Sequence, residues 1–148
     1  MNDLTNLIVF TKSIISIILA FTIIIYIISI IANWKIFTKA GEKGIKSIIP
    51  FYNSYTLYKL CWETKYFWYL LVISFIYILL IHLTSKGFLG ALLTLVSAIT
   101  ILDIKAMFCN KLASAFGKGK GFSFGLFFFP VIFKLILGFG SSEYQKNN

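Results

Sequence analysis

Charged residues are scarce in this chain of 148 residues, of which 13% are charged and 59% are hydrophobic. A soluble domain has about 25% charged residues, and half of that charge does not cover a surface in water. The shortage, with a mean hydropathy of +0.88, excludes a soluble globular protein, a disordered tail and a disulfide scaffold. It predicts an all-α integral membrane protein with one domain, residues 1–148.

Arginine is absent and acidic residues are few, so 14 lysines against 5 acids give a net charge of +9. The lysines occupy short segments between apolar runs rather than one continuous basic face. This arrangement favours contact with anionic membrane lipids over nucleic acid binding, and we expect no nucleic acid partner.

Residues that bind metals or form disulfides are also few. Cys61 and Cys109 are the only cysteines, His82 is the only histidine, and no CxxC or His/Cys cluster occurs. We therefore expect reduced structural cysteines, no metal site and no cofactor. His82 is expected to be a polar residue at the outer membrane interface rather than a proton relay.

Four apolar runs are long enough to be transmembrane helices, which need about 20 residues. The predicted spans are about 7–32, 66–83, 87–108 and 121–139. The fourth run contains Pro130 and Lys134; a membrane helix tolerates proline, and a lysine near its far end can reach the interface.

The lysine distribution predicts the orientation. Residues 33–66 carry six lysines and residues 105–120 carry four, whereas the turn at 84–86 carries one. The positive-inside rule places the two lysine-rich segments in the cytoplasm, so both termini of a four-span chain lie outside. The predicted location is the bacterial cytoplasmic membrane.

Residues 36–62 are predicted to form an interfacial helical segment between the first two spans. Apolar and polar pairs alternate there near the helical period, with Gly41 as the C-cap of the first helix and Pro50 as a second stop. Asn53 or Ser54 could cap another short helix, and the alternative is a solvated loop. The lysines expected to contact lipid headgroups here and in the second basic segment are Lys39, Lys43, Lys46, Lys118 and Lys120.

Several short motifs resemble those of a family of small, uncharacterised bacterial membrane proteins. They include Trp34-Lys35-Ile36-Phe37, Ile49-Pro50-Phe51-Tyr52-Asn53, Phe116-Gly117-Lys118-Gly119 and Gly138-Phe139-Gly140 within residues 34–144. Members are often loosely labelled signal peptidase I, and the resemblance implies a multi-span fold without an established activity. The chain has Ile45 where the family tends to have tryptophan.

A signal-peptidase activity would require a serine activated by a desolvated lysine on the outer face. The outer candidates are Ser85 with Lys86, and Lys134 with Ser141 or Ser142, but no outer domain could hold a substrate. A membrane protease is therefore the least favoured function, and we expect no enzymatic activity.

Span three carries the main intramembrane polar residues, which are Thr94, Ser97, Thr100 and Asp103. Steps of three place them near one helix face, which would suit a small oligomeric channel or transporter; such residues also serve in helix packing. Asp103 is expected in the inner leaflet, where it either pairs with a lysine, Lys105 or Lys111, or faces water at the lipid interface. Lys134 is expected at the opposite depth of the membrane.

Small residues at a spacing of four predict helix-packing faces, within the chain or between two copies, at Gly121 and Gly125, and at Gly87 and Ala91. Gly117 and Gly119 are expected in a loop. The favoured function is a non-catalytic accessory, assembly or immunity-type membrane protein that acts through lipid and helix contacts. Its expected partners are membrane lipids, including anionic ones, and a second copy or another membrane protein.

Overall fold

The computed structural model describes residues 2–83 and 87–145, and every regular element in those ranges is a helix. This confirms the predicted all-α fold. The elements are α1 (Asn2–Lys39), the 3-10 helix η1 (Gly44–Ser47), α2 (Pro50–Cys61), α3 (Thr64–Leu83), α4 (Phe88–Ser114), α5 (Lys120–Phe128) and α6 (Pro130–Phe139).

Three of these helices have the length and composition of membrane spans. They cover Thr5–Lys39, Thr64–Leu83 and Phe88–Ser114. The first three predicted spans are therefore confirmed as helices long and apolar enough to cross a bilayer, which takes about 20 residues at 1.5 Å each.

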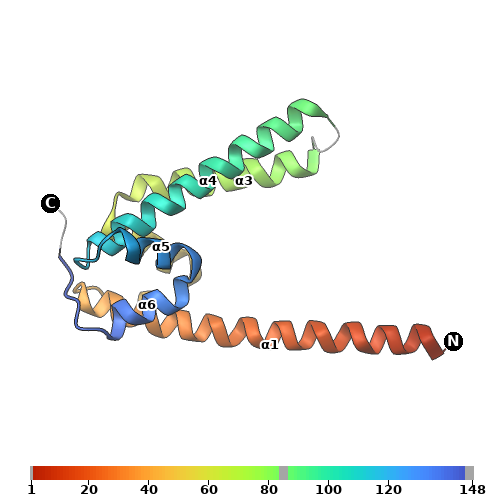
Figure 1. Ribbon diagram of the computed structural model, residues 1–148, viewed down its shortest axis with the longest axis horizontal. Coiled ribbons are helices and arrows are strands. Elements are labelled where there is room, and N and C mark those ends of the chain that lie inside the picture. The colour runs from red at the N-terminus through yellow and green to blue at the C-terminus, as the bar shows by residue number, and fades with distance from the viewer. Residues whose placement is uncertain (1, 84–86, 146–148) are drawn as a thin grey trace.

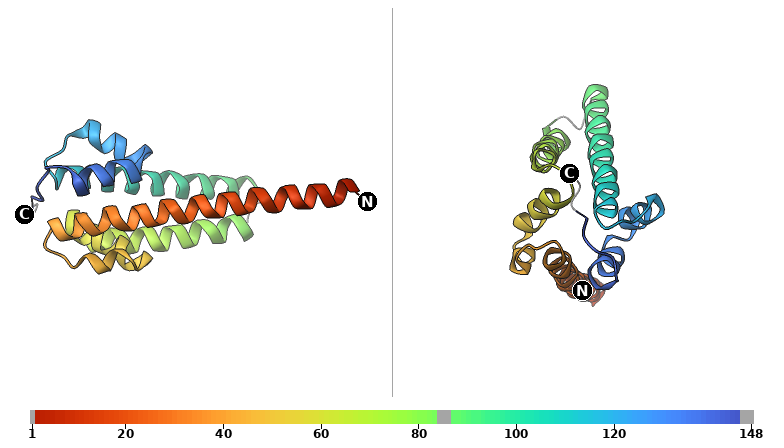
Figure 2. Two further views of the ribbon diagram at one scale, coloured as in Figure 1. Left: turned by 90° about the horizontal axis from the view of Figure 1, so that it is seen from below. Right: turned by 90° about the vertical axis from the view of Figure 1, so that its left-hand side faces the viewer.

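The helices form two arms that meet at one end of the molecule (Figure 1). One arm is the antiparallel pair of α3 and α4, and the other is α1, which extends further than that pair (Figure 2). The shorter elements η1, α2, α5 and α6 gather where the two arms meet. We call this the junction end.

The buried core of the described residues lies at the junction end. It combines side chains from α1, α2, α4, α5 and α6 and the turn after α4. By contrast, residues 5–27 of α1 are exposed throughout. The core residues are Ile36, Phe37, Leu57, Cys61, Cys109, Leu112, Ala113, Ala115, Phe116, Leu126 and Leu137.

The same glycine motif ends α1 and α4. Gly41 has a φ of 76°, and the amide of Glu42 donates to the carbonyl of Phe37 at 2.8 Å. Gly117 has a φ of 65°, and the amide of Lys118 donates to the carbonyl of Ala113 at 2.9 Å. Each is a Schellman motif, in which a left-handed glycine allows the chain to reverse. The predicted C-cap at Gly41 is confirmed.

After Gly41 the chain folds back along α1. The hydroxyl of Tyr26 donates to the carbonyl of Ile48 at 3.0 Å, although Tyr26 lies about 20 Å before Lys39 along the helix. Pro50 then starts α2 as its first residue. The expectation that Pro50 ends a helix and that Asn53 or Ser54 caps the next one is wrong: Ile49 is the N-cap, because proline suits the first turn.

The segment predicted as the fourth span, 121–139, is a helical hairpin. The rings of Phe122 and Phe133 lie 4.9 Å apart, whereas one continuous helix would separate them by about 16 Å. The chain therefore reverses at Phe129, and Pro130 starts α6. With 9 and 10 residues, α5 and α6 are each too short to cross the roughly 30 Å hydrocarbon core.

This reversal also changes the position of the C-terminal segment. The hydroxyl of Tyr144 donates to the carbonyl of Leu60 at 2.6 Å, and the amide of Gln145 donates to the carbonyl of Ala115 at 2.7 Å. Residue 145 is therefore at the junction end, whereas residue 2 is at the far end of α1 (Figure 1). The expectation that both ends of the chain share one side depended on a fourth span, which these contacts do not support.

The hairpin gives a matched test at two glycines of α5. A Cβ at Gly125 would collide with the ring of Phe133, whereas a Cβ at Gly121 would meet no atom within 4 Å. We expect Gly125→Ala to destabilise the protein by about 1–3 kcal/mol through overpacking. Gly121→Ala should be neutral or stabilising by up to about 1 kcal/mol. Denaturation of both variants in detergent measures the difference, and equal stabilities would contradict the hairpin packing.

Candidate functional site

Most polar side chains of the predicted polar face of α4 form hydrogen bonds within that helix. The hydroxyls of Thr94, Ser97 and Thr100 donate to carbonyls one turn earlier, at 2.8–3.0 Å. Asp103 is exposed and, within the described ranges, has no ion pair. The ammonium of Lys105 lies instead 5.0 Å from the ring centre of Phe127. The predicted pairing of Asp103 with Lys105 or Lys111 is therefore not formed.

Of the four predicted packing residues, only Gly125 makes a close helix contact. Gly121 and Gly87 face open space, and Ala91 is exposed. A close contact that was not predicted occurs at Gly138, where a Cβ would lie 3.0 Å from the carbonyl oxygen of Ala32 in α1. Gly138 has no glycine or alanine at a spacing of four, and its packing partner lies on another helix.

Lys39 connects α1 to the C-terminal end of α6. Its ammonium donates to the carbonyls of Leu137 at 2.8 Å, Gly140 at 2.5 Å and Ser142 at 3.2 Å. Carbonyls at a helix C-terminus lack partners in the helix and attract a cation. Lys39 therefore caps α6 through three carbonyl contacts, and its predicted contact with a lipid headgroup stays a prediction.

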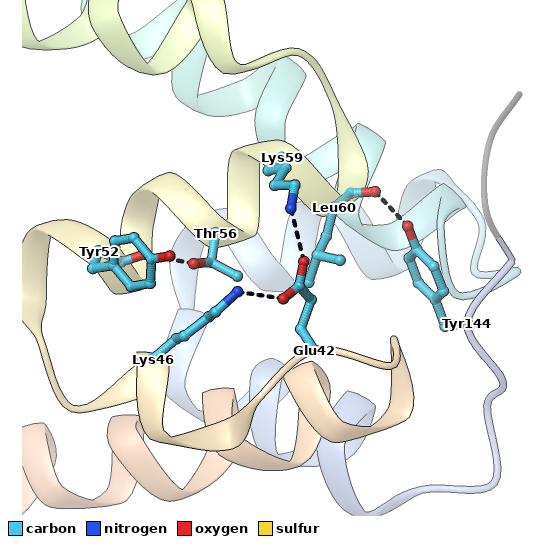
Figure 3. A network of polar contacts seen from close by, with 7 residues as sticks. All are labelled: Glu42, Lys46, Tyr52, Thr56, Lys59, Leu60 and Tyr144. Atoms are coloured by element: carbon cyan, nitrogen blue, oxygen red, sulfur yellow. Dashed lines mark hydrogen bonds and ion pairs between the residues drawn. The ribbon is translucent and has the colours of Figure 1, made fainter.

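Lys46 is likewise engaged within the protein. Glu42 forms ion pairs with Lys46 in η1 and, at 3.0 Å, with Lys59 in α2 (Figure 3). The hydrogen bonds from these two ammonium groups lower the pKa of the Glu42 carboxyl. The carboxylate thus holds the reversed segment after α1 against α2.

The other three predicted headgroup lysines are without such partners. Within the described ranges, the side chains of Lys43, Lys118 and Lys120 form no hydrogen bond or ion pair. Lys43 and Lys120 are exposed, and Lys118 is half-buried. These three stay candidates for contact with lipid phosphates.

A small cavity of about 210 Å³ lies between α2, α3, α4 and the α5–α6 hairpin. Its polar lining comes from Ser54 and Tyr58 in α2, Lys105 and Cys109 in α4, and Lys134 in α6. Lys134 therefore does not lie at the opposite depth from Asp103 and Lys105, contrary to expectation. Because α6 runs back towards the junction end, Lys134 and Lys105 line one cavity.

The two cysteines are buried and free, as predicted. The thiol of Cys61 donates to the carbonyl of Leu57 at 3.0 Å, and burial raises its pKa to about 12. Burial also raises the pKa of the neighbouring Tyr58 to about 12. Neither group ionises near neutral pH, so Tyr58, which lines the cavity, adds no negative charge to it.

The serine–lysine pairs considered for a protease are not assembled. Lys134 lines the cavity, whereas Ser141 and Ser142 lie beside Lys39 in another surface pocket. Ser85 and Lys86 lie outside the described residues. His82 is exposed, and its Nδ1 lies 2.9 Å from the carbonyl oxygen of Ile78.

Aromatic side chains surround the junction end. Trp62 and Tyr66 stack with ring centres 3.8 Å apart, and Trp34 packs over Gly44. Phe51 and Trp68 are exposed at an apolar cleft between α2 and α3. Tryptophan and tyrosine favour the headgroup level of a membrane. These aromatic residues lie at the same end of the molecule as the lysine-rich segments.

The charged network predicts an acid-sensitive contribution to stability. We expect Glu42→Gln to lower the stability by about 1 kcal/mol or less near pH 7, since the pairs are partly exposed. A lowered carboxyl pKa stabilises the fold above the ordinary value near 4.5, and this contribution is lost as the pH falls through the lowered value. Thermal denaturation of the wild type and of Glu42→Gln, at pH 7 and at a pH below the lowered pKa, should show a difference in stability at pH 7 only.

Glu63→Gln is the control for that measurement, because Glu63 pairs with Lys65 at a site where both side chains are more than half exposed. It should leave the stability unchanged. A difference between wild type and Glu42→Gln that persisted below the lowered pKa would contradict the role of the ion pairs.

The buried thiols predict slow alkylation. With a pKa of about 12, the thiolate fraction of Cys61 at pH 8 is on the order of 10⁻⁴. A maleimide should label the folded wild type slowly and the denatured protein fully. Ser114→Cys in a Cys61→Ala/Cys109→Ala background exposes a thiol and should label rapidly; equal rates would show that the native cysteines are accessible.

Residues 45–147, more than half of the chain, match a family described as "Family of unknown function (DUF5684)". The match covers α2 to α6 and most of η1, including every residue that lines the cavity. Comparisons with curated proteins and with solved structures found no match.

Proposed function

This chain belongs to the DUF5684 family of unknown function. From the position of its lysines, we propose that it is a bacterial cytoplasmic-membrane protein with three spans and that its junction end faces the cytoplasm. It acts as a non-catalytic accessory protein through contacts with anionic lipid and with other membrane helices.

The observation that carries this proposal is the segregation of charge along the molecule. The segments rich in lysine, 33–66 and 105–120, both belong to the junction end, together with residue 145. Between Lys12 and Lys35, α1 has no charged residue over about 33 Å, close to the thickness of the hydrocarbon core. Lysine near a cytoplasmic leaflet is attracted to its anionic lipids.

The two reversed segments fit the cytoplasmic leaflet. The tip of the α5–α6 hairpin exposes Phe128, Phe129 and Ile132, and the segment before α2 exposes Ile48 and Ile49. Apolar residues exposed at these turns suit the acyl region, while the lysines at the base of each segment suit the phosphates. Both segments therefore enter the leaflet without crossing it.

Contact with another membrane helix would use α1, whose residues 5–27 are exposed. The channel alternative has weaker support, because the hydroxyls of Thr94, Ser97 and Thr100 already donate to their own helix. Hydroxyls used in this way offer a permeating ion fewer free groups.

Cysteine labelling tests the proposed topology. In a Cys61→Ala/Cys109→Ala background, Asn6→Cys, Lys43→Cys and Glu143→Cys each place one thiol at an exposed position. An impermeant maleimide should label residue 6 from outside the cell, and residues 43 and 143 only in inverted membrane vesicles. Labelling of residue 143 from outside would restore a fourth span and overturn the proposal.

A further inference from the structure

The cavity at the junction end holds two lysines and no acidic residue. Lys105 and Lys134 line it, and the remaining polar groups are the hydroxyls of Ser54 and Tyr58 and the thiol of Cys109. Within the described ranges, neither lysine forms a hydrogen bond or an ion pair with another residue. Lys134 is half-buried and Lys105 is exposed, and no acidic residue of the lining neutralises either one. An anion in the cavity could therefore accept charge-assisted hydrogen bonds from both ammonium groups.

The neighbours of each ammonium group support this view. Burial lowers the pKa of Lys134, and among the described residues the only charge-bearing groups that oppose this effect are the thiols of Cys109 and Cys61. An anion beside Lys134 would raise its pKa and favour the charged ammonium. The ammonium of Lys105 lies over the face of Phe127, an attraction that leaves its N–H donors available. Asp103, the nearest acid in sequence to Lys105, is exposed and does not line the cavity.

The size of the cavity limits what it can hold. At about 210 Å³, it is smaller than the range of about 300–1,000 Å³ typical of pockets that enclose a whole drug-sized ligand. It is large enough for a small anionic group. The rest of such a ligand must lie outside the cavity.

A second hollow provides a place for the remainder of the ligand. A groove of about 360 Å³ lies between α4 and α5, with Ala106, Phe124 and Phe128 in its apolar wall. Phe127 also lines this groove, and the ammonium of Lys105 lies over its ring. Lys105 therefore lies between the basic cavity and an apolar groove. An amphiphile could place its charged group in the cavity and its apolar part in the groove.

The depth matches a lipid headgroup. Lys105 lies about 26 Å along α4 from Phe88, which places it near the inner boundary of a hydrocarbon core of about 30 Å. Basic pockets between membrane helices on the cytoplasmic side are known sites for anionic headgroups. We propose that Lys105 and Lys134 bind the phosphate of an anionic phospholipid in this cavity, with an acyl chain in the α4–α5 groove.

This inference deepens the proposed function and rests on it. The test uses the full chain in nanodiscs that contain phosphatidylcholine with phosphatidylglycerol. After extraction in detergent, native mass spectrometry counts the phosphatidylglycerol that stays bound. We expect Lys134→Met and Lys105→Met each to weaken retention by roughly 10- to 100-fold, because each removes a charge-assisted contact. Lys134→Arg should retain the lipid.

Lys111→Met is the matched control: it removes the same charge from an exposed position of α4 that does not line the cavity. It should retain lipid as the wild type does. Helical circular dichroism checks that each variant folds, and Lys105→Met decides the test if Lys134→Met does not fold. Equal retention by the folded Lys105→Met and Lys111→Met variants would overturn the inference.

Inorganic phosphate separates the two sources of the anion. Phosphate added at millimolar concentration should leave the bound lipid in place, and its complete displacement of the lipid would assign the cavity to free phosphate instead. The labelling of residues 6, 43 and 143 is independent of this result. Correct topology without lipid retention refutes the site alone, whereas labelling of residue 143 from outside refutes the proposed function.

Discussion

Proline lacks a backbone N–H and has a φ near that of a helix, so it suits the first turn of a helix and breaks a helix interior. Both prolines of this chain use that property at a reversal: Pro50 is the first residue of α2 and Pro130 is the first residue of α6. Each starts the helix that returns the chain to the junction end. In the first turn of a helix the backbone N–H groups have no acceptor within the helix, so the absent N–H of proline costs no hydrogen bond there.

The reversal at Pro130 determines the contacts of the whole C-terminal third. It turns one apolar run into two short helices, and it places α6 beside α1 with Gly138 against the carbonyl of Ala32. Lys39 then caps the end of α6 with three carbonyl contacts. The packing of α6 adds to the contacts of α1, which itself contributes Ile36 and Phe37 to the core.

The lysines of the junction end fall into groups with different roles. Lys39 and Lys46 satisfy carbonyls or a carboxylate within the protein, whereas Lys43 and Lys120 are exposed. Lys134 is half-buried and lines a cavity. A count of basic residues indicates which end carries the charge, and only the contacts show which charges are available to a ligand.

The local sequence determined the helical class, the first three spans and the stop at Gly41, since each depends on neighbouring residues: apolar length, charge-free runs and a glycine that accepts a left-handed φ. The reduced, buried cysteines and the end of the molecule that carries most of the lysines also followed from it. The sequence did not determine whether Pro130 kinks one helix or separates two, because both are compatible with the residues around it.

That choice depended on long-range packing. Phe133 folds back onto Gly125 and Phe122, and α6 finds its partner in α1 more than 90 residues earlier. The meeting of Lys105 and Lys134, the role of Lys39 and the location of residue 145 all follow from this one reversal. Contacts between residues so far apart have no period or spacing in the sequence, so only the tertiary structure decided them.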